Sequence, residues 1–110
     1  RVTIAYDVDK LPLIPGVREN GLTKYLTRAS KTNREYVESF VKFEGEPIPS
    51  DLIEFLWDAQ TSGGLLLSIA PEKAEEYVKQ ARVAGAPFTV IIGEVLPEQD
   101  KALIFRYRKM

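Results

Sequence analysis

The feature that most constrains the fold is a polar loop that passes through two glycines into an apolar run. A carboxylate, an amide and two hydroxyls at residues 58–62 precede Gly63 and Gly64, and the apolar run occupies residues 65–69. Such a run predicts a strand buried on both faces, at the centre of a sheet. Glycines before a buried strand allow positive φ or the close approach of another group. We therefore look for a functional site in this loop first.

Composition narrows the chemistry that the chain can perform. Its 110 residues, 45% hydrophobic and 28% charged, are typical of one globular domain. The net charge of −1 gives no general attraction to nucleic acid or to an anionic membrane. Cysteine and histidine are both absent, which excludes disulfides, thiolate nucleophiles, histidine bases and the common zinc sites. We expect one cytoplasmic domain over residues 1–110, with a binding or supporting role.

The first half of the chain predicts one strand followed by helices. Period-2 alternation at residues 2–8 indicates a strand, and the prolines and glycine at residues 11–16 end it. A short helix is expected at residues 17–28. A second helix is expected to begin at Thr32, because Thr32 and Glu35 have the spacing of a capping box.

Two apolar faces are expected on the helices that follow. The helix after Thr32 should bury Tyr36, Val37, Phe40 and Val41, before a loop at residues 43–49. Ser50 should cap a third helix. The inner face of that third helix should comprise Ile53, Leu56 and Trp57.

The second half predicts strand, helix, strand, strand. After the run at 65–69, a helix should extend from Pro71 to a C-cap at Gly85. Strands are expected at 88–95 and at 102–108, and the charges of the last strand are typical of a sheet edge. The order indicates an α+β or mixed α/β fold with a mixed sheet of about four strands and helices mainly on one face.

The residues of the loop leave two interpretations open. Successive N–H groups near the glycines can form an anion-binding nest, and an aspartate can hold a hard cation. A tight structural turn explains the same residues. Trp57, beside the loop, can stack on a base or belong to the core.

Three segments resemble a known family. The run Asp58-Ala59-Gln60-Thr61-Ser62-Gly63-Gly64-Leu65-Leu66 is similar to the Asp-Pro-Gln-Thr-Ser-Gly-Gly-Leu-Leu signature of selenophosphate synthetase (selenide, water dikinase). Leu11-Pro12-Leu13-Ile14-Pro15-Gly16-Val17 and Ile92-Gly93-Glu94-Val95 are similar to two further segments of its C-terminal domain, in the same order.

The resemblance implies the C-terminal domain of a two-domain enzyme in the aminoimidazole ribonucleotide synthetase-like superfamily. That enzyme makes selenophosphate, AMP and phosphate from ATP, selenide and water, with Mg²⁺. Its nucleophile and metal ligands lie in an N-terminal ATP-binding domain that this sequence lacks. The resemblance therefore implies no catalytic residue, no metal ligand and no tightly bound cofactor here, and a homodimeric full-length enzyme.

What the resemblance implies for this chain is half of an interdomain site. The loop residues that would face the N-terminal domain are Asp58, Gln60, Thr61, Ser62, Gly63 and Gly64. Asn33 is an additional contact, since it matches the Asn of a Gly-Gly-Thr-x-x-Asn segment of the family. This chain lacks both glycines of that segment, and Ala59 replaces the proline of the loop signature.

A different class of function also fits the sequence. A free-standing small-molecule-binding or interaction module of the same fold would need no partner domain. The chain begins with Arg1 inside a predicted strand, which favours a piece of a longer protein. We expect the 110 residues alone to be catalytically inactive.

Overall fold

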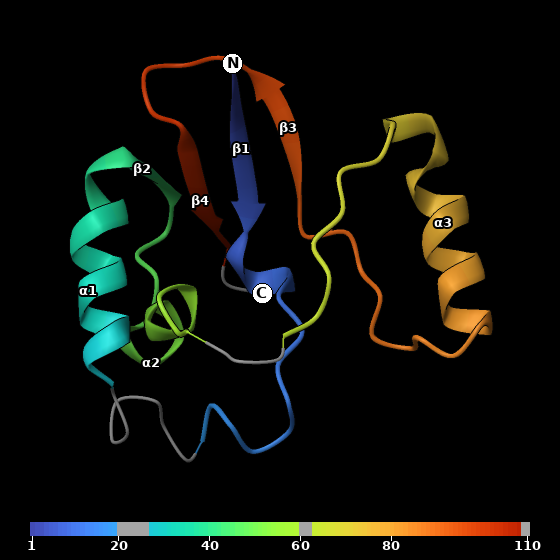
Figure 1. Cartoon of the computed structure of the whole chain (residues 1–110), viewed down its shortest axis with the longest axis horizontal. Helices are drawn as coiled ribbons and strands as arrows, with labels where there is room; N and C mark the ends of the chain where they lie inside the picture. Colours follow the sequence, from blue (N-terminus) through green and yellow to red (C-terminus); the bar gives the residue numbers. More distant parts are fainter. Residues whose placement is uncertain (20–26, 60–62, 109–110) are drawn as a thin grey trace.

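A computed structural model describes residues 1–19, 27–59 and 63–108 of the chain (Figure 1). Within these ranges one mixed sheet has the strand order β2-β4-β1-β3. Strand β4 runs parallel to both of its neighbours, whereas β3 is antiparallel to β1. The strands are β1 (Val2–Asp7), β2 (Val41–Gly45), β3 (Gly93–Pro97) and β4 (Leu103–Tyr107). The mixed α/β class and the four-stranded mixed sheet are confirmed.

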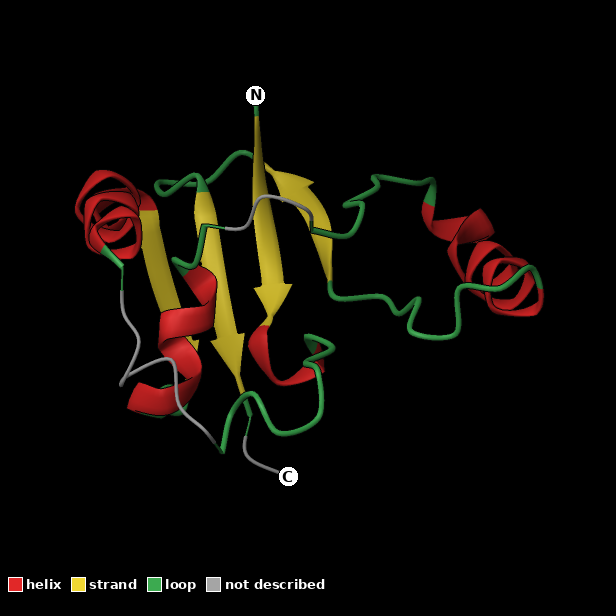
Figure 2. Cartoon of the chain, turned by 60° about the horizontal axis from the view of Figure 1, so that its bottom comes forward, coloured by secondary structure: helices red, strands yellow, loops and turns green. Residues whose placement is uncertain are grey.

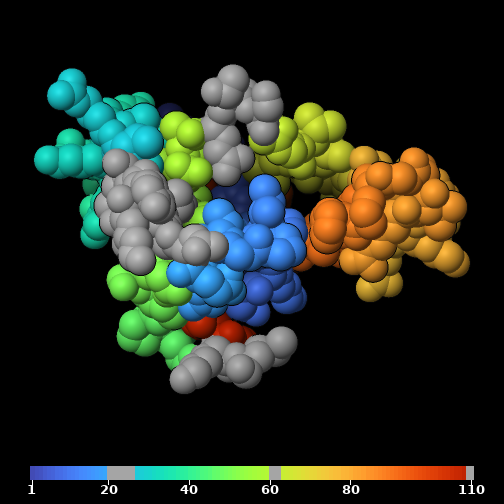
Figure 3. Space-filling view, turned by 90° about the horizontal axis from the view of Figure 1, so that it is seen from below, coloured from blue at the N-terminus to red at the C-terminus, as the bar shows by residue number. Residues whose placement is uncertain are grey.

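Helical segments connect the strands. They are η1 (Val8–Lys10), α1 (Arg28–Val37), η3 (Glu38–Phe40), α2 (Ser50–Ile53), η4 (Glu54–Leu56) and α3 (Pro71–Val83). Figure 2 shows α2 in front of the sheet, and Figure 1 shows α3 standing apart beside β3. Figure 3 shows the segment of α3 projecting from the rest of the chain. None of the helices in the described residues is long and apolar enough to cross a membrane.

The hydrophobic core lies on the face of the sheet that α2 and η4 cover. Phe105 and Tyr107 of β4 point to this face, where they meet Leu52 of α2 and Trp57. The rings of Trp57 and Phe105 have centroids 5.8 Å apart. Burying each of these side chains stabilises the fold by about 2 kcal/mol. Packing against β4 therefore stabilises the helical segments α2 and η4.

The third helix and its caps follow the predicted pattern only in part. A helix does begin at Ser50, and Trp57 after it is buried as predicted. The buried residue of the helix itself is Leu52, whereas Ile53 and Leu56 of the predicted inner face are only half-buried. Its N-cap is Pro49 rather than Ser50. Most of the helix expected at 17–28 lies outside the described residues, and residues 17–19 form a turn.

The start of α1 corrects the predicted capping box. The helix begins at Arg28, and the Thr27 side chain accepts a hydrogen bond from the Ser30 N–H at 3.2 Å. Thr32 lies inside the helix, where its hydroxyl donates to the Arg28 carbonyl at 3.0 Å. The prediction was wrong because Thr27 takes the N-cap position, so that Thr32 falls within the helix.

Strand β2 was not predicted. Val41 is buried in β2 rather than on a helix, and the expected loop at 43–49 begins inside this strand. Tyr36 and Phe40, which were expected to be buried, are exposed. Val41 and Phe43 do alternate with Lys42 and Glu44, but a run of four residues is too short to outweigh the helical spacing that precedes it.

The apolar runs at 65–69 and 88–92 are not strands. Residues 63–70 form no regular element, and Leu65 is 90% exposed. The strand expected at 88–95 begins only at Gly93 and continues to Pro97. The predicted total of four strands was nevertheless right, because β2 contributes the strand that 65–69 was expected to form.

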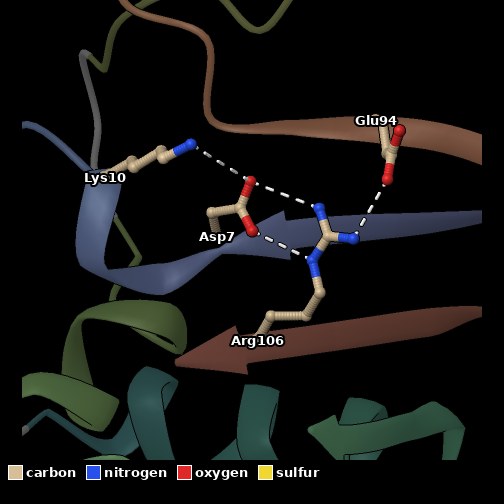
Figure 4. Close-up of polar contacts among 4 residues, drawn as sticks. All are labelled: Asp7, Lys10, Glu94 and Arg106. Carbon is tan, nitrogen blue, oxygen red and sulfur yellow. Dashed lines mark hydrogen bonds and ion pairs between the residues drawn. The ribbon is translucent and has the colours of Figure 1, made fainter. Parts of the chain in front are cut away.

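The last strand is interior rather than an edge. β4 pairs with β1 on one side and with β2 on the other. Its charge is accommodated because Asp7 accepts from Arg106 Nε at 2.9 Å and Glu94 accepts from Nη1 at 3.0 Å (Figure 4). These hydrogen bonds, with that to Glu94 the stronger influence, raise the pKa of Arg106. A charged residue is therefore tolerated inside the sheet.

Candidate functional site

Only the N-terminal end of the predicted loop lies next to the core. Asp58 is half-buried, whereas Ala59, Gly63 and Gly64 are exposed. Gln60, Thr61 and Ser62 lie outside the described residues. The chain therefore leaves the core after Trp57, and its described residues Ala59, Gly63 and Gly64 lie in solvent.

Gly64 is not required by the packing of this chain. Its φ is not positive, and a Cβ added there would meet no atom within 4 Å. Gly93 is the opposite case, because its Cβ would overlap the Ala5 carbonyl oxygen of the neighbouring strand. Glycine loses more conformational entropy on folding than other residues do. No contact of Gly64 in the described fold offsets this loss. Of the two reasons that the sequence offered for this glycine, the structure excludes positive φ, and the close approach of another group stays a prediction.

Asn33 connects α1 to the start of the loop. Its Nδ2 donates a hydrogen bond to the Trp57 carbonyl oxygen at 3.0 Å, across 24 residues of sequence. This bond fixes the backbone immediately before Asp58. The structure thus gives Asn33 a positioning contact to the residue that precedes the loop, and a contact from Asn33 to a second domain stays a prediction.

Trp57 belongs to the core. The side chain is 2% exposed and packs among Val8, Leu52 and Phe105. Its indole N–H is buried without a hydrogen-bond acceptor among the described residues. Stacking on a base would require an exposed ring face. Trp57 is therefore a core residue that precedes the loop, and not a stacking surface.

A basic pocket lies at the N-terminus of α1. Its volume is about 410 Å³, and it is lined by Thr27, Arg28, Ser30, Lys31, Arg34 and Glu54. Asn33 sits on the same helix between Ser30 and Arg34, and Glu54 lies three residues before Trp57. The pocket and the start of the loop are therefore neighbours, joined by the Asn33 bond.

Charge in this pocket is only partly compensated. Arg34 pairs with Glu38 at 3.3 Å and with Glu54 at 3.9 Å. Arg28 and Lys31 form no ion pair with another residue in the described ranges. The first turn of α1 also contains no acidic residue. Cations beside the positive end of a helix dipole repel it, so the site is suited to an anion.

Sequence reasoning missed the basic residues of this pocket. Arg28, Lys31 and Arg34 recur every three residues, a spacing that places them on one side of a helix. The signal was hidden because the helix was expected to begin at Thr32. A start at Thr27 would have revealed it.

The described residues offer no metal centre. No group of three or more carboxylates within residues 1–19, 27–59 and 63–108 is arranged to hold a metal ion.

Comparison with known proteins decides the family. Selenide, water dikinase of Caldanaerobacter subterraneus is 33% identical over 105 residues, which are 96% of this chain. The enzyme of that name from Bdellovibrio bacteriovorus is 44% identical over 81 residues, 74% of the chain. That from Desulfitobacterium hafniense is 39% identical over 98 residues, 89% of the chain. The chain belongs to the selenide, water dikinase family.

The match covers a limited part of each family member. The chain spans 30%, 22% and 28% of the length of these three relatives. No family model matches the chain. The relationship is therefore to one domain-sized region of the selenide, water dikinases.

Proposed function

We propose that this chain is the C-terminal domain of a two-domain selenophosphate synthetase. The intact enzyme forms selenophosphate, AMP and phosphate from ATP, selenide and water, in the cytoplasm and as a homodimer. The short span of each relative that the chain matches supports this role. An N-terminal domain binds ATP and carries the nucleophile, and this chain closes over the phosphates. Neither nucleic acid nor a membrane is a partner.

The observation that carries the proposal is the basic pocket next to the signature loop. Arg28 and Lys31 supply two cations without ion-pair partners in the described residues, at the positive end of α1. The Asn33 bond holds this end of the helix against the backbone that precedes Asp58. A phosphate group bridging the two domains satisfies both the cations and the helix terminus.

The chain's contribution to the reaction is positioning and charge stabilisation. Backbone N–H groups near Gly63 and Gly64, with the hydroxyls of Thr61 and Ser62, donate hydrogen bonds to the negative charge. Gln60 adds a side-chain amide, and Asp58 shapes the entry of the loop. Fixed donors in a site that excludes water stabilise charge that develops in the transition state. Gly64 leaves room for the approaching group, which its lack of neighbours within 4 Å supports.

Magnesium binds elsewhere in the enzyme. The described residues contain no carboxylate cluster that fits it, whereas the pocket of α1 fits an anion. Mg²⁺ neutralises phosphate charge when bound with ATP, and its ligands belong to the N-terminal domain.

The test replaces the two cations in an intact enzyme that contains this domain. Arg28→Gln together with Lys31→Gln should raise KM for ATP or lower kcat by about 10-fold or more, since hydrogen bonds to charged groups contribute about 1.5–3 kcal/mol. Melting temperature should change little, because both side chains are exposed. Lys79→Gln, on exposed α3, is the matched control and should leave the kinetics unchanged. Kinetics equal to those of Lys79→Gln would refute the role of the pocket.

The loop is tested separately. Thr61→Ala with Ser62→Ala in the intact enzyme should lower activity with little change in melting temperature. A parallel fall of stability and activity would indicate a structural turn. The 110-residue chain by itself should form no selenophosphate from ATP and selenide; measurable product would instead support a self-sufficient module.

A further inference from the structure

One carboxylate lies in the wall of the basic pocket. Glu54 of η4 lines the pocket together with residues of α1, and 16% of its side chain is exposed. The carboxylate lies 3.9 Å from Arg34 Nη1, which is longer than a hydrogen bond. Among the described residues no donor forms a hydrogen bond to this carboxylate. Glu54 therefore presents unsatisfied acceptor oxygens to a pocket whose other charges are positive.

Neutralising Arg34 does not explain the position of Glu54. Arg34 Nε and Nη2 already donate to the two carboxylate oxygens of Glu38, at 3.3 and 3.4 Å. Removing a carboxylate from water without hydrogen bonds to it costs free energy. A second carboxylate near the same arginine also weakens the attraction of the pocket for an anion. A ligand that brings a hydrogen-bond donor to Glu54 would offset both effects.

The pocket thus combines donors with an acceptor. Arg28 and Lys31 are cations that only donate hydrogen bonds, whereas the ionised carboxylate of Glu54 only accepts them. Ser30 is 3% exposed and lies in the wall of the pocket, with its hydroxyl oxygen 3.3 Å from that of Thr27. This set of groups matches an oxyanion that also carries an O–H group.

Oxyanions differ in whether they keep a proton at neutral pH. Inorganic orthophosphate keeps at least one O–H group, whereas sulfate, which has the same tetrahedral shape, keeps none. A phosphate ester has its second pKa at about 6, so it has lost most of its O–H groups at neutral pH. The pocket volume of about 410 Å³ is at the small end of the range for small-molecule sites. Orthophosphate with bound water fits both this size and the hydrogen-bonding groups of the wall.

We propose that the basic pocket binds inorganic orthophosphate and that Glu54 is the residue that selects it. Glu54 accepts a hydrogen bond from the O–H group of the ligand, while Arg28 and Lys31 donate to its charged oxygens. The inference rests on the proposed function, because it takes the same pocket as the phosphate site. It identifies the ligand of that site as the free phosphate product, in place of the phosphate groups of ATP.

The test compares orthophosphate with sulfate by isothermal titration calorimetry, on an intact enzyme that contains this domain. Both titrations use about pH 7 and the same ionic strength. Binding that is lost in Arg28→Gln with Lys31→Gln belongs to the pocket. We expect the pocket to bind orthophosphate about 10-fold or more tightly than sulfate, because sulfate has no proton to donate to Glu54. Glu54→Gln should remove most of this preference, since an amide also donates hydrogen bonds.

Glu38→Gln is the matched control. It removes the other carboxylate that pairs with Arg34, and Glu38 does not line the pocket. The ratio of the two affinities should therefore stay as in the wild-type enzyme, even if both anions bind more tightly. Circular dichroism and the melting temperature verify that each variant is folded.

The outcomes separate this inference from the proposed function. Equal affinities of the wild-type pocket for the two anions, or a preference that survives Glu54→Gln, would overturn the role of Glu54 and leave the pocket as a phosphate site. A wild-type enzyme in which Arg28→Gln with Lys31→Gln removes no binding of either anion would overturn both.

Discussion

Gly93 and Gly64 show how one residue type can serve opposite needs. Gly93 sits where β3 crosses against the backbone of Ala5, and only the absence of a Cβ allows the two strands to pair. Gly64 has free space around it and no positive φ. At the residue scale, then, the fold requires the glycine of the Ile-Gly-Glu-Val segment, whereas the described fold does not require Gly64 of the signature loop.

Alanine at these two positions should give opposite results. Gly93→Ala should lower the free energy of unfolding by about 2 kcal/mol or more, because the Cβ overlaps backbone that cannot move without breaking the β1–β3 pairing. Gly64→Ala should leave it unchanged or raise it by up to about 1 kcal/mol, since alanine restricts the unfolded chain. Urea denaturation of both variants measures the difference. A destabilised Gly64→Ala would show that the fold does need this glycine.

At the scale of elements, helix α1 connects the core to the candidate site. Val37 packs toward the core, the basic residues line the pocket, and Asn33 holds the start of the loop. Tyr36 lies on the exposed side of the helix. The residue at which the helix begins therefore decides which side chains face the core, the pocket and the start of the loop. The cap at Thr27 decides that start.

The two threonines of this region provide a matched pair. Thr27→Ala should cost about 1 kcal/mol of stability, the usual effect of removing an N-cap side chain. Thr32→Ala should cost nothing or stabilise by a few tenths of a kcal/mol, because alanine has the higher helix propensity. Thermal unfolding of each variant provides the comparison. If Thr32→Ala proves the more damaging, the helix begins at the capping box after all.

At the scale of the whole molecule, ion pairs join segments far apart in sequence. Arg18 Nε lies 2.7 Å from Asp51 Oδ2, which ties the loop after η1 to α2. The hydrogen bond from Arg18 lowers the pKa of Asp51 against the opposing effect of burial. Arg106 joins β1, β3 and β4 in the same way (Figure 4). Such ion pairs restrain the positions of these elements relative to one another.

Acid should weaken the Arg18–Asp51 connection. Because the folded pKa of Asp51 is depressed, its stabilising effect is present above about pH 4 and is lost as pH falls below that value. The melting temperature of Asp51→Asn should therefore lie below that of the natural chain at pH 7, and the gap should close toward pH 2–3. Asp9→Asn, at an exposed aspartate, should show no such convergence. A difference in melting temperature that is independent of pH would contradict the lowered pKa of Asp51.

Local patterns by themselves determined where several elements form. Period-2 alternation located β1 and β4, and Pro71 with the apolar spacing after it located α3. The signature residues identified the family and pointed to the loop at 58–64. These features depend on residues close together in sequence, so the sequence carries them directly.

The tertiary structure decided which surfaces meet. The apolar run at 65–69 reads as a buried strand, yet β2 occupies a place in the sheet and the run is exposed. The charges of β4 suggest an edge, but Asp7 and Glu94 from neighbouring strands neutralise Arg106 and allow an interior position. The basic pocket exists because Thr27 starts α1 and Asn33 reaches Trp57. Burial and charge compensation depend on contacts between distant residues, and only the folded chain brings those residues together.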